Sequence, residues 1–252
     1  MDTEGCADRL AEAVRSRTAI APLSDEFELT VDDAYDIQDA VIDRLGGRGE
    51  AAKLGLTSRA KQEQMNVDEP IYGWFLEGAA LDIGQPLEVD RFIQPRVEPE
   101  IAFLTSAPLS GTGVTSAHVL ASTAAVLPAI DILDSRYAGY KFTLADVAAD
   151  DASAAAFCVG DPVGIDGLDL RLTGCVFERN GELVATAAGA AVLEHPAAAV
   201  AWFVRKLADR GELLPAGSLV LAGALTAAIP VSAGDVIRVT LDRIGAVELT
   251  CR

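Results

Sequence analysis

The sequence predicts an α+β fold, in which a mainly helical N-terminal region precedes a longer β-rich part. Helical periodicity occupies the first fifth of the chain, and apolar strand-like runs follow it. Strands and helices do not alternate steadily, so a parallel βαβ architecture is disfavoured, and there is no internal repeat or low-complexity linker. We therefore divide the chain into residues 1–75 and 76–252, and we expect the two parts to form one continuous compact unit.

The N-terminal helices are predicted from their periodicity and their end signals. An early helix is expected over Asp8–Arg15. In the next one, Thr30 followed by Asp33 resembles a capping box, with Asp in place of the usual Glu or Gln. Apolar residues then recur at helical spacing as far as Leu45, and Gly46-Gly47 supplies the end signal.

Strand-like runs dominate the rest of the chain. The stretch "AAKLGLTS" predicts a short strand entering a turn, and "RVEPEIAFLT" and "AVLPAIDILD" are apolar runs interrupted by acids. Asn180-Gly181 lies between two such runs and is a type I′ hairpin signal. A further helix is expected over "PAAAVAWFVRKLADR", with Gly211 as its stop. The C-terminal runs alternate and predict strands, with turns at Pro230 and Ala233-Gly234.

Composition and charge exclude several classes of function. Half of the 252 residues are hydrophobic and the formal net charge is −18. Such a charge repels nucleic-acid phosphates and anionic membranes, although it can equally reflect solubility or a salty habitat. No apolar run approaches the roughly 18 residues of a membrane span, and the first residues lack a signal-peptide pattern. We expect a cytoplasmic protein without a nucleic-acid or membrane partner.

Thiol and imidazole chemistry are poorly supported. The four cysteines are widely separated and form no C-x-x-C pair, so reduced thiols are expected and a zinc site is disfavoured. His118 and His195 have no partner at metal-ligand spacing, and His195 precedes Pro196 at an expected helix start, which favours a structural role. The nucleophile-elbow, P-loop and dinucleotide-binding motifs are all missing.

Carboxylates remain as the candidate chemistry. Glu98 and Glu100 lie two positions apart in an expected strand and so share one face, and Asp131 lies in a second apolar run. Two carboxylates on one face repel each other, and burial raises that cost. Either a hard cation such as Mg²⁺ lies between them, or the face is solvated and the glutamates pair with Arg96. The pattern alone leaves both interpretations open.

Lys53 is flanked by small and apolar residues in "AAKLGLTS". A lysine in such a run is commonly an edge residue whose ammonium reaches solvent. It can instead anchor a substrate carboxylate or carry a proton. The neighbouring residues do not decide between these roles.

Five stretches taken together resemble one family. "KLGLTSRAKQEQMNVDEPIYG", "QPRVEPEIAF", "LPAIDILDSRY", "LADVAADDASAAAF" and "LAGALTAAIPVSAGD" occur in the order and spacing of the 2-hydroxypenta-2,4-dienoate hydratase and 4-oxalocrotonate decarboxylase group. This group belongs to the fumarylacetoacetate hydrolase superfamily. The resemblance covers the chain from Ala19 to Val247. It implies a helical N-terminal region packed on a twisted, partly closed mixed β-roll with a metal site at its mouth.

The resemblance also implies roles for individual residues. Glu98, Glu100 and Asp131 match the family's Mg²⁺ ligands, with Mn²⁺ as the alternative ion, and Lys53 matches its active-site lysine. The expected substrate-binding residues are Leu56, Thr57, Ser58, Ile71, Ser153 and Thr226. The family's "ADNAS" reads "ADDAS" here, so Asp151 replaces an amide and would add a fourth acid if it faced the site.

The stretch "DEPIYG" favours the decarboxylase branch. Hydratases of the group tend to read D-x-P-D-F-G, and Ile71, which stands in place of the second acid, cannot activate water. The implied reaction is Mg²⁺-dependent decarboxylation of the dicarboxylate 2-oxo acid 2-oxohex-3-enedioate to 2-hydroxypenta-2,4-dienoate, in meta-cleavage degradation of aromatics. The alternatives are hydration of 2-hydroxypenta-2,4-dienoate and an inactive scaffolding subunit. The resemblance further implies a homo-oligomer, associated with a sister hydratase.

Overall fold

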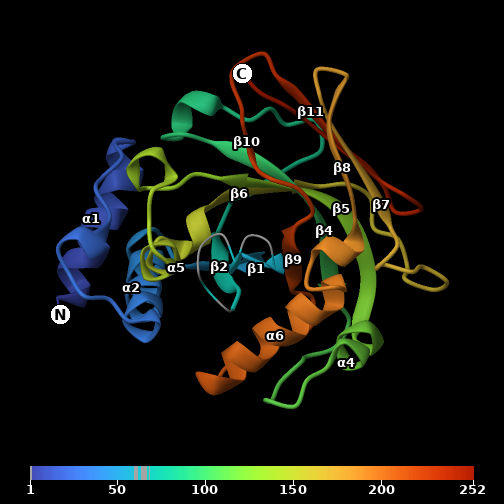
Figure 1. Ribbon diagram of the computed structural model, residues 1–252, viewed down its shortest axis with the longest axis horizontal. Coiled ribbons are helices and arrows are strands. Elements are labelled where there is room, and N and C mark those ends of the chain that lie inside the picture. Colours follow the sequence, from blue (N-terminus) through green and yellow to red (C-terminus); the bar gives the residue numbers. More distant parts are fainter. Residues whose placement is uncertain (1, 60–61, 64–66, 68) are drawn as a thin grey trace.

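A strongly curled mixed sheet forms the centre of the molecule, and helices and a second sheet cover its outer side (Figure 1). The computed structural model describes residues 2–59, 62–63, 67 and 69–252, with the backbone alone at residue 50. The order of the larger sheet is β2-β1-β9-β4-β5-β6-β3, and β10 pairs with β4. β1 is parallel to β9 and β3 to β6, whereas the other pairs are antiparallel. The predicted α+β class and curled β-roll are confirmed.

The bounds of the elements are as follows. The larger sheet contains β1 (Arg48–Gly55), β2 (Ile71–Leu76), β3 (Ala80–Leu81), β4 (Arg96–Thr105), β5 (Thr123–Leu133), β6 (Ala154–Val159), β9 (Leu219–Ala224) and β10 (Ile229–Pro230). The smaller sheet contains β7 (Gly174–Arg179), β8 (Glu182–Ala188), β11 (Val236–Leu241) and β12 (Gly245–Thr250). The helices are α1 (Thr3–Ser16), α2 (Val31–Arg44), α4 (Ser116–Ala121), α5 (Leu144–Ala149) and α6 (Pro196–Asp209), with 3₁₀ turns η1 (Leu23–Asp25), η2 (Val89–Arg91), η3 (Ala138–Tyr140), η4 (Asp151–Ser153) and η5 (Gly189–Ala191).

The helix end signals explain where α1 and α2 begin and end. The Thr30 hydroxyl accepts a hydrogen bond from Asp33 N, and the Asp33 carboxylate accepts one from Thr30 N, which confirms the capping box. α2 ends just before Leu45, and Gly46 follows at φ +115°. α1 begins at Thr3, earlier than predicted, because Asp2 caps it. The charged first turn of α1 carries too little apolar periodicity to be recognised.

The other turn signals have mixed outcomes. Asn180 and Gly181 have φ of 57° and 77°, as a type I′ turn requires, and they join β7 to β8. The His195 imidazole accepts a hydrogen bond from Ala197 N at the start of α6, so its structural role is confirmed. The turn predicted at Pro230 is wrong, because Pro230 pairs with Arg96 in the short strand β10. A proline fits there because β10 is short and pairs only with β4 among the described strands.

The N-terminal part of the chain contributes two strands to the larger sheet. β1 and β2 pair with each other, and β1 also pairs with β9 from the C-terminal part. The boundary predicted between residues 75 and 76 falls inside β2. The division into two parts stays a prediction.

The inner face of the larger sheet has an apolar end and a charged end. Alternation along each strand places Lys53, Glu98 and Asp131 on this face, together with a small apolar cluster. The cluster consists of Ala51, Phe75, Ala102, Leu127, Ala129, Phe157 and Leu221. It fills the roll beneath the charged residues, which therefore lie toward one mouth.

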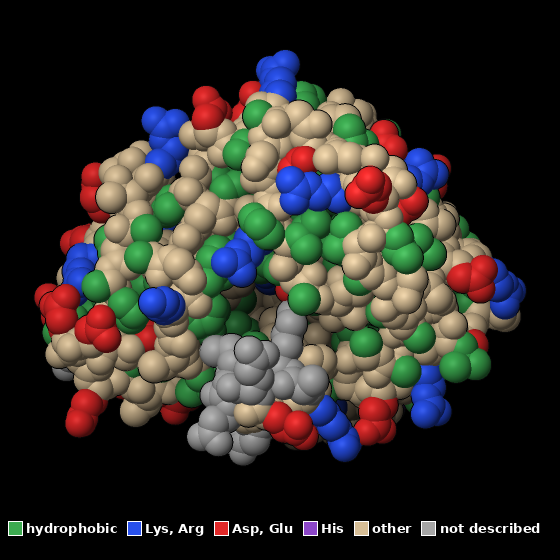
Figure 2. Space-filling model, turned by 45° about the horizontal axis from the view of Figure 1, so that its top comes forward, with side chains coloured by type: hydrophobic (Ala, Val, Ile, Leu, Met, Phe, Trp, Pro, Cys, Tyr) green, Lys and Arg blue, Asp and Glu red, His purple; other side chains and the backbone are tan. Residues whose placement is uncertain are grey.

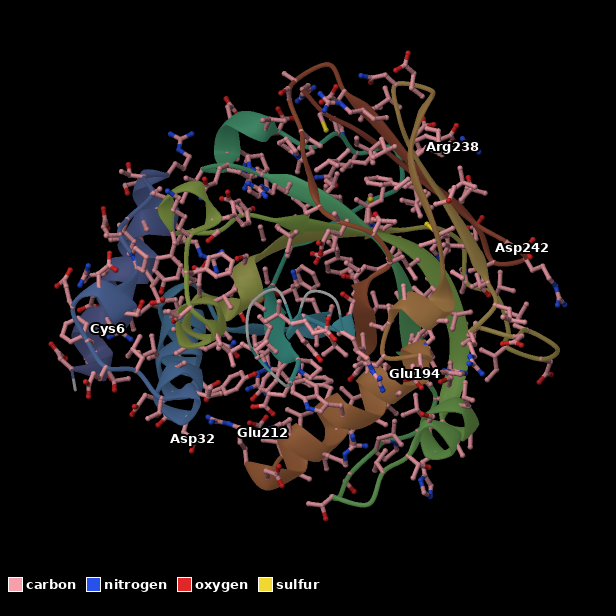
Figure 3. The ribbon with its side chains drawn as sticks, in the orientation of Figure 1. Cys6, Asp32, Glu194, Glu212, Arg238 and Asp242 are labelled. Atoms are coloured by element: carbon pink, nitrogen blue, oxygen red, sulfur yellow. The ribbon has the colours of Figure 1, made fainter. Side chains whose placement is uncertain are left out.

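Most charged side chains lie on the outside of the molecule. Figure 2 shows acidic and basic side chains interspersed over one face, and Figure 3 places Asp32, Arg238 and Asp242 at the periphery. Within the described part of the chain, no helix combines the length and apolar character that crossing a membrane requires. A smaller set of carboxylates is buried, and three of these lie together inside the roll.

Candidate metal and substrate site

Three carboxylates converge on the inner face of the sheet. Glu98 and Glu100 project from β4, and Asp131 lies directly opposite Glu98 on β5. One oxygen of each lies within 4.8 Å of the other two, and Glu100 and Asp131 are 0% exposed. The interpretation of a solvated face is wrong, because all three side chains are buried and Arg96 stacks on Tyr140 instead.

Glu100 is fully buried in this cluster, as is Asp131. Its Oε2 accepts a hydrogen bond from Gly223 N at 2.6 Å, and its Oε1 has no hydrogen-bond partner among the described residues. Burial and, after it, the neighbouring Asp131 raise the pKa of Glu100 well above its ordinary value. A buried carboxylate oxygen without a partner is costly, and a divalent cation supplies one. The cluster therefore fits a hard cation bound through oxygen.

Gly223 allows this close approach of β9 to the cluster. Its φ is +111°, and a Cβ at this position would lie 2.0 Å from Thr57 Oγ1. Thr57 thus packs against the strand segment whose N–H holds Glu100. Any larger residue at position 223 would displace the threonine and strain the backbone.

Lys53 projects from β1 into the acidic cluster. Its Nζ lies 2.6 Å from Asp131 Oδ2, and the residue is 1% exposed. β1 lies between β2 and β9, so the interpretation of Lys53 as an edge residue reaching solvent is wrong. The ammonium offsets part of the negative charge that the cluster concentrates inside the roll.

A cavity of about 450 Å³ reaches Lys53 and Glu98. Its volume lies in the range of sites for small molecules. Figure 2 shows a hollow on the face turned to the viewer, with hydrophobic and basic side chains on its rim. The remaining lining residues are Gly55, Leu56, Ile71, Arg96, Leu133, Tyr140, Phe142, Val147, Ala152, Ser153, Ala227 and Ala228.

The structure brings together part of the predicted substrate-binding set. Leu56, Ile71 and Ser153 line the cavity. Thr57 lies behind Gly223, and Ser58 and Thr226 are not among the lining residues. The roles of all six stay predictions.

Prediction from sequence missed the aromatic pair Tyr140 and Phe142, which line the cavity. The run "RYAGYKF" shortly after Asp131 was the available signal.

Comparison with known proteins assigns the chain to a family. Residues 41–252 match the model of the fumarylacetoacetate (FAA) hydrolase C-terminal domain. The chain belongs to the fumarylacetoacetate hydrolase family. A 4-oxalocrotonate decarboxylase from Pseudomonas sp. (strain CF600) is 44% identical over 220 residues, which cover 86% of this chain and 83% of the relative.

Two further relatives in the fumarylacetoacetate hydrolase family cover more of the chain. A 2-keto-4-pentenoate hydratase from Paraburkholderia xenovorans (strain LB400) is 38% identical over 250 residues, or 97% of this chain and 93% of the relative. The structure of 4-oxalocrotonate decarboxylase from Pseudomonas putida G7, complexed with magnesium and adipate, superposes with a TM-score of 0.96 at 38% identity. That match covers 100% of this chain and 97% of the other. The predicted family resemblance is confirmed.

A turn with left-handed backbone conformation forms one wall of the cavity. Asp151, Ala152 and Ser153 have φ of 51°, 50° and 56°, although none is a glycine. Each such residue costs of order 1–3 kcal/mol, so the surroundings must hold the turn in place. Ser153 N donates to Asp150 O at 2.9 Å, and Ser153 Oγ donates to Asp150 Oδ2. As a result, Ala152 and Ser153 face the cavity.

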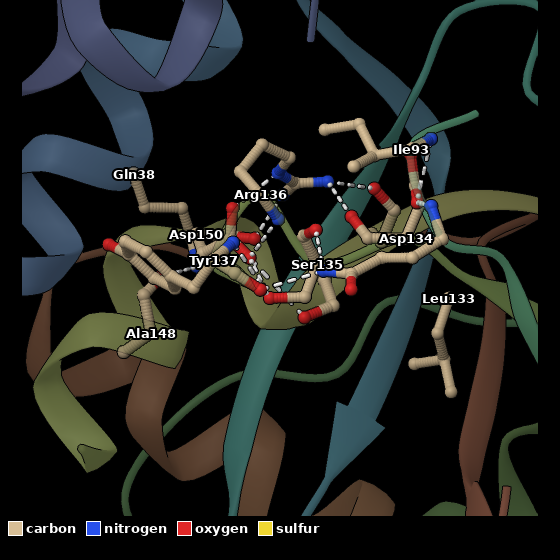
Figure 4. Close-up of polar contacts among 12 residues, drawn as sticks. Gln38, Ile93, Leu133, Asp134, Ser135, Arg136, Tyr137, Ala148 and Asp150 are labelled. Atoms are coloured by element: carbon tan, nitrogen blue, oxygen red, sulfur yellow. Dashed lines mark hydrogen bonds and ion pairs between the residues drawn. The ribbon is translucent and has the colours of Figure 1, made fainter. Parts of the chain in front are cut away.

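A buried ion pair anchors this turn to the end of β5 (Figure 4). The Arg136 guanidinium pairs with the Asp150 carboxylate and donates to Asp134 O. The Asp134 carboxylate in turn accepts hydrogen bonds from the backbone of Ile93 and Gln94, just before β4. Burial raises the pKa of Asp150 to about 6, even though Arg136 acts in the opposite direction. The network joins the segments that flank the strands carrying the three acids.

Asp151 does not join the acidic cluster. Its Oδ1 accepts a hydrogen bond from Trp74 N at 2.8 Å, on the edge of β2 that pairs with no other described strand. The condition under which Asp151 would add a fourth acid to the site is therefore not met: among the described residues, the metal-type cluster comprises the two glutamates of β4 and Asp131. Burial raises the pKa of Asp151 to about 8.

Replacing Asp151 by Asn is expected to stabilise the protein at alkaline pH. Because the folded-state pKa is raised, folded Asp151 keeps a proton that the unfolded chain loses, so stability falls as pH rises from about 4 to about 8. The Asn side chain also accepts the hydrogen bond from Trp74 N, but it does not titrate. The free energy of unfolding at pH 8 should therefore rise by about 1–4 kcal/mol in the variant. Urea denaturation at pH 5 and pH 8 measures the difference, with exposed Asp161→Asn as control. An unchanged pH dependence would contradict the assignment.

Proposed function

We propose that this chain catalyses metal-dependent decarboxylation of 2-oxohex-3-enedioate to 2-hydroxypenta-2,4-dienoate and CO₂, in the degradation of aromatic compounds. The observation that carries the proposal is a buried three-carboxylate cluster in contact with Lys53, beside a cavity that Lys53, Glu98 and the aliphatic Ile71 line. The decarboxylase relative at 44% identity supports it. So does the similar structure that is complexed with magnesium and a six-carbon dicarboxylate.

Glu98, Glu100 and Asp131 would hold Mg²⁺, with Mn²⁺ as the alternative ion. A bound divalent ion supplies Lewis-acid stabilisation of the negative charge that develops on a 2-oxo acid. Asp131 also holds Lys53 at 2.6 Å, so the same carboxylate positions the ammonium beside the cluster. Gly223 N donates a hydrogen bond that holds Glu100 in place.

Lys53 is proposed to deliver the proton. When the C5–C6 bond breaks, C6 leaves as CO₂ and the electron pair forms the C4–C5 double bond. The original C3–C4 double bond shifts to C2–C3, and negative charge arrives on the C2 oxygen. Lys53 Nζ donates a proton to that oxygen, which gives 2-hydroxypenta-2,4-dienoate. Leu56 and Ile71 keep water away from the reacting carbons and so suppress hydration.

Product analysis tests this proposal directly. The protein is incubated with enzymatically generated 2-oxohex-3-enedioate, with Mg²⁺ or with EDTA, while CO₂ and the ultraviolet spectrum are recorded. Metal-dependent CO₂ release with formation of a dienoate is the expected result. Consumption of supplied 2-hydroxypenta-2,4-dienoate without CO₂ release would assign the hydratase reaction instead. If neither reaction is detected, the interpretation as an inactive scaffolding subunit is favoured.

Hydration of 2-hydroxypenta-2,4-dienoate is the second candidate. It is favoured by the hydratase relative, which is 38% identical over 97% of this chain. Both reactions would use the same cluster and Lys53, because each proceeds through a 2-oxo or 2-hydroxy acid with charge on the C2 oxygen. They differ in whether a group in the cavity can activate water, and Ile71 cannot.

Replacing Ile71 by Asp is expected to raise hydration of 2-hydroxypenta-2,4-dienoate above the wild-type level by about ten-fold, because a carboxylate within reach of a bound water acts as a general base. Ile71 is 3% exposed and leans over Gly55, where a Cβ would come within 2.9 Å of its Cγ1. Ile71→Asn, of similar size but without the charge, is the matched control. Steady-state hydration rates of the two variants are compared. Equal hydration rates for Ile71→Asp and Ile71→Asn would contradict the assignment of position 71 as the one that distinguishes decarboxylases from hydratases.

We further propose that the protein is a cytoplasmic homo-oligomer that associates with a sister hydratase consuming the dienoate. The buried cysteines, unpaired in the described structure, are consistent with a reducing compartment. β8 is an edge strand, and Leu183 on it is 64% exposed beside half-exposed Val176 and Val184. Apolar side chains on an open edge are typical of a contact surface. Light scattering after gel filtration, with and without the hydratase, tests both associations.

A further inference from the structure

Arg96 continues the line of site residues toward the cavity mouth. It occupies the same face of β4 as Glu98 and Glu100, at successive two-residue steps. Exposure rises along this line, from 0% at Glu100 and 8% at Glu98 to a half-buried Arg96. The cavity therefore has a cation near its opening and the acidic cluster at its base.

The Arg96 guanidinium is held in place by an aromatic ring. Its carbon lies 3.9 Å from the centre of the Tyr140 ring. The Tyr140 hydroxyl donates to Leu133 O and Gln94 O, at 3.1 Å and 3.2 Å, and so fixes the ring against β4 and β5. Burial raises the pKa of Tyr140, which keeps the phenol neutral and these hydrogen bonds intact. A stacked guanidinium keeps its N–H groups free to bind in the ring plane.

Arg96 has no acidic partner in the described part of the chain. No carboxylate there lies within 4.0 Å of its guanidinium, and its N–H groups make no hydrogen bond to a described residue. In contrast, Arg48 stacks on Trp74 in the same way, at 4.1 Å, but is paired with Glu212. A preorganised cation that faces a cavity without an internal anion is suited to an anionic ligand.

We propose that Arg96 and Tyr140 form a subsite for the second carboxylate of a dicarboxylate substrate. This inference rests on the proposed function, in which one end of a 2-oxo acid lies at the acidic cluster. Successive same-face positions on a strand lie about 6.7 Å apart. The two carboxylate carbons of an extended six-carbon diacid are about 6 Å apart. Arg96 thus lies one such step beyond Glu98, where the far carboxylate of a six-carbon diacid ends.

The subsite has a consequence for kinetics. The far carboxylate is charged in the substrate but leaves as neutral CO₂, so its contact with Arg96 weakens as the reaction proceeds. An interaction made in the ground state and lost before the transition state lowers KM and kcat together and leaves kcat/KM nearly unchanged. Arg96 therefore acts on binding: it favours dicarboxylate ligands over monocarboxylates, and the monocarboxylate product is released from it.

Ligand affinity tests the subsite without requiring turnover. Binding of adipate and of hexanoate, which differ by one carboxylate, is measured by calorimetry on the Mg²⁺-loaded protein. Wild type is expected to prefer adipate. Arg96→Gln should weaken adipate binding by roughly 10- to 100-fold and leave hexanoate binding unchanged, because a charge-assisted bidentate contact is lost. Arg96→Lys keeps the positive charge but cannot make a bidentate contact, so its affinity for adipate should lie between those of the wild type and Arg96→Gln.

Arg48→Gln is the matched control, because Arg48 is stacked similarly but lines a different cavity. It should leave both affinities unchanged. If wild type shows no preference for adipate, or if Arg96→Gln keeps that preference, the subsite is overturned. If the preference is present and depends on Arg96 while no CO₂ is released from 2-oxohex-3-enedioate, the subsite stands and the proposed decarboxylation falls.

Discussion

Replacing Glu100 by Gln is expected to lower kcat/KM for 2-oxohex-3-enedioate by on the order of 10³-fold or more, because it removes a charged ligand from the proposed metal site. Glu100 is fully buried, and its Oε1 has no hydrogen-bond partner among the described residues. A Gln side chain can still accept from Gly223 N, so the local packing is kept. The variant therefore separates loss of charge from loss of shape.

Thermal unfolding gives a readout of this substitution that does not depend on activity. Ligands that bind only the folded state raise the melting temperature, so Mg²⁺ should stabilise the wild type. In the Glu100→Gln protein this stabilisation should shrink strongly, whereas the metal-free variant should be at least as stable as the wild type, since repulsion with Asp131 is relieved. Glu248→Gln, a surface variant on β12, is the control. An Mg²⁺-induced shift that persists in Glu100→Gln would place the metal elsewhere.

The acidic cluster could be predicted from sequence because it depends on local rules. Alternation along a strand puts Glu98 and Glu100 on one face whatever the rest of the fold does. The addition of Asp131 required the antiparallel register of β4 and β5, which the family resemblance supplied. Lys53 was ambiguous because its role depends on whether β1 is an edge or a central strand. That property is set by the parallel pairing with β9, far along the chain.

Features that depend on distant contacts or on strain could not be predicted. The partner of Arg96 is Tyr140, which reaches it only because η3 folds back over the ends of β4 and β5. The left-handed turn at residues 151–153 contains no glycine, so the usual signal for positive φ is missing. Asp151 would have added a fourth acid had it faced the site, yet it accepts a hydrogen bond from Trp74 N at the open edge of β2. The sequence identifies the chemical groups, and the tertiary fold determines which of them meet.

Substitution of Lys53 by Arg and by Met is expected to separate its charge from its proton. Lys53 Nζ contacts Asp131 Oδ2 inside the roll, so both substitutions act on the same buried ion pair. Arg keeps the positive charge but holds its proton permanently, whereas Met removes both. If Lys53 delivers a proton to the C2 oxygen, both variants should lose at least about 10²-fold in kcat.

Stability should respond differently to the two substitutions. Without metal, Lys53→Met leaves Asp131 beside two glutamates with no cation from β1, which should lower the free energy of unfolding by about 3–5 kcal/mol. Mg²⁺ should restore much of that loss, because the ion replaces the missing positive charge. Lys53→Arg should remain close to the wild type in stability, apart from the cost of fitting a larger group into a buried position. Urea denaturation with and without Mg²⁺ measures these differences.

The comparison of kcat between the two variants decides the role of the residue. Lys206→Met, which breaks an ion pair with Glu69 on the surface, controls for general effects of losing a lysine. If Lys53→Arg keeps kcat within about three-fold of wild type, the residue acts through its charge alone. The proton would then reach the C2 oxygen from another donor, and Ser153, which also lines the cavity, would be the first side chain to replace. If both variants lose activity while Lys53→Arg retains Mg²⁺-dependent stabilisation, the ammonium proton takes part in the reaction, because the variant that keeps the charge and the metal site still fails.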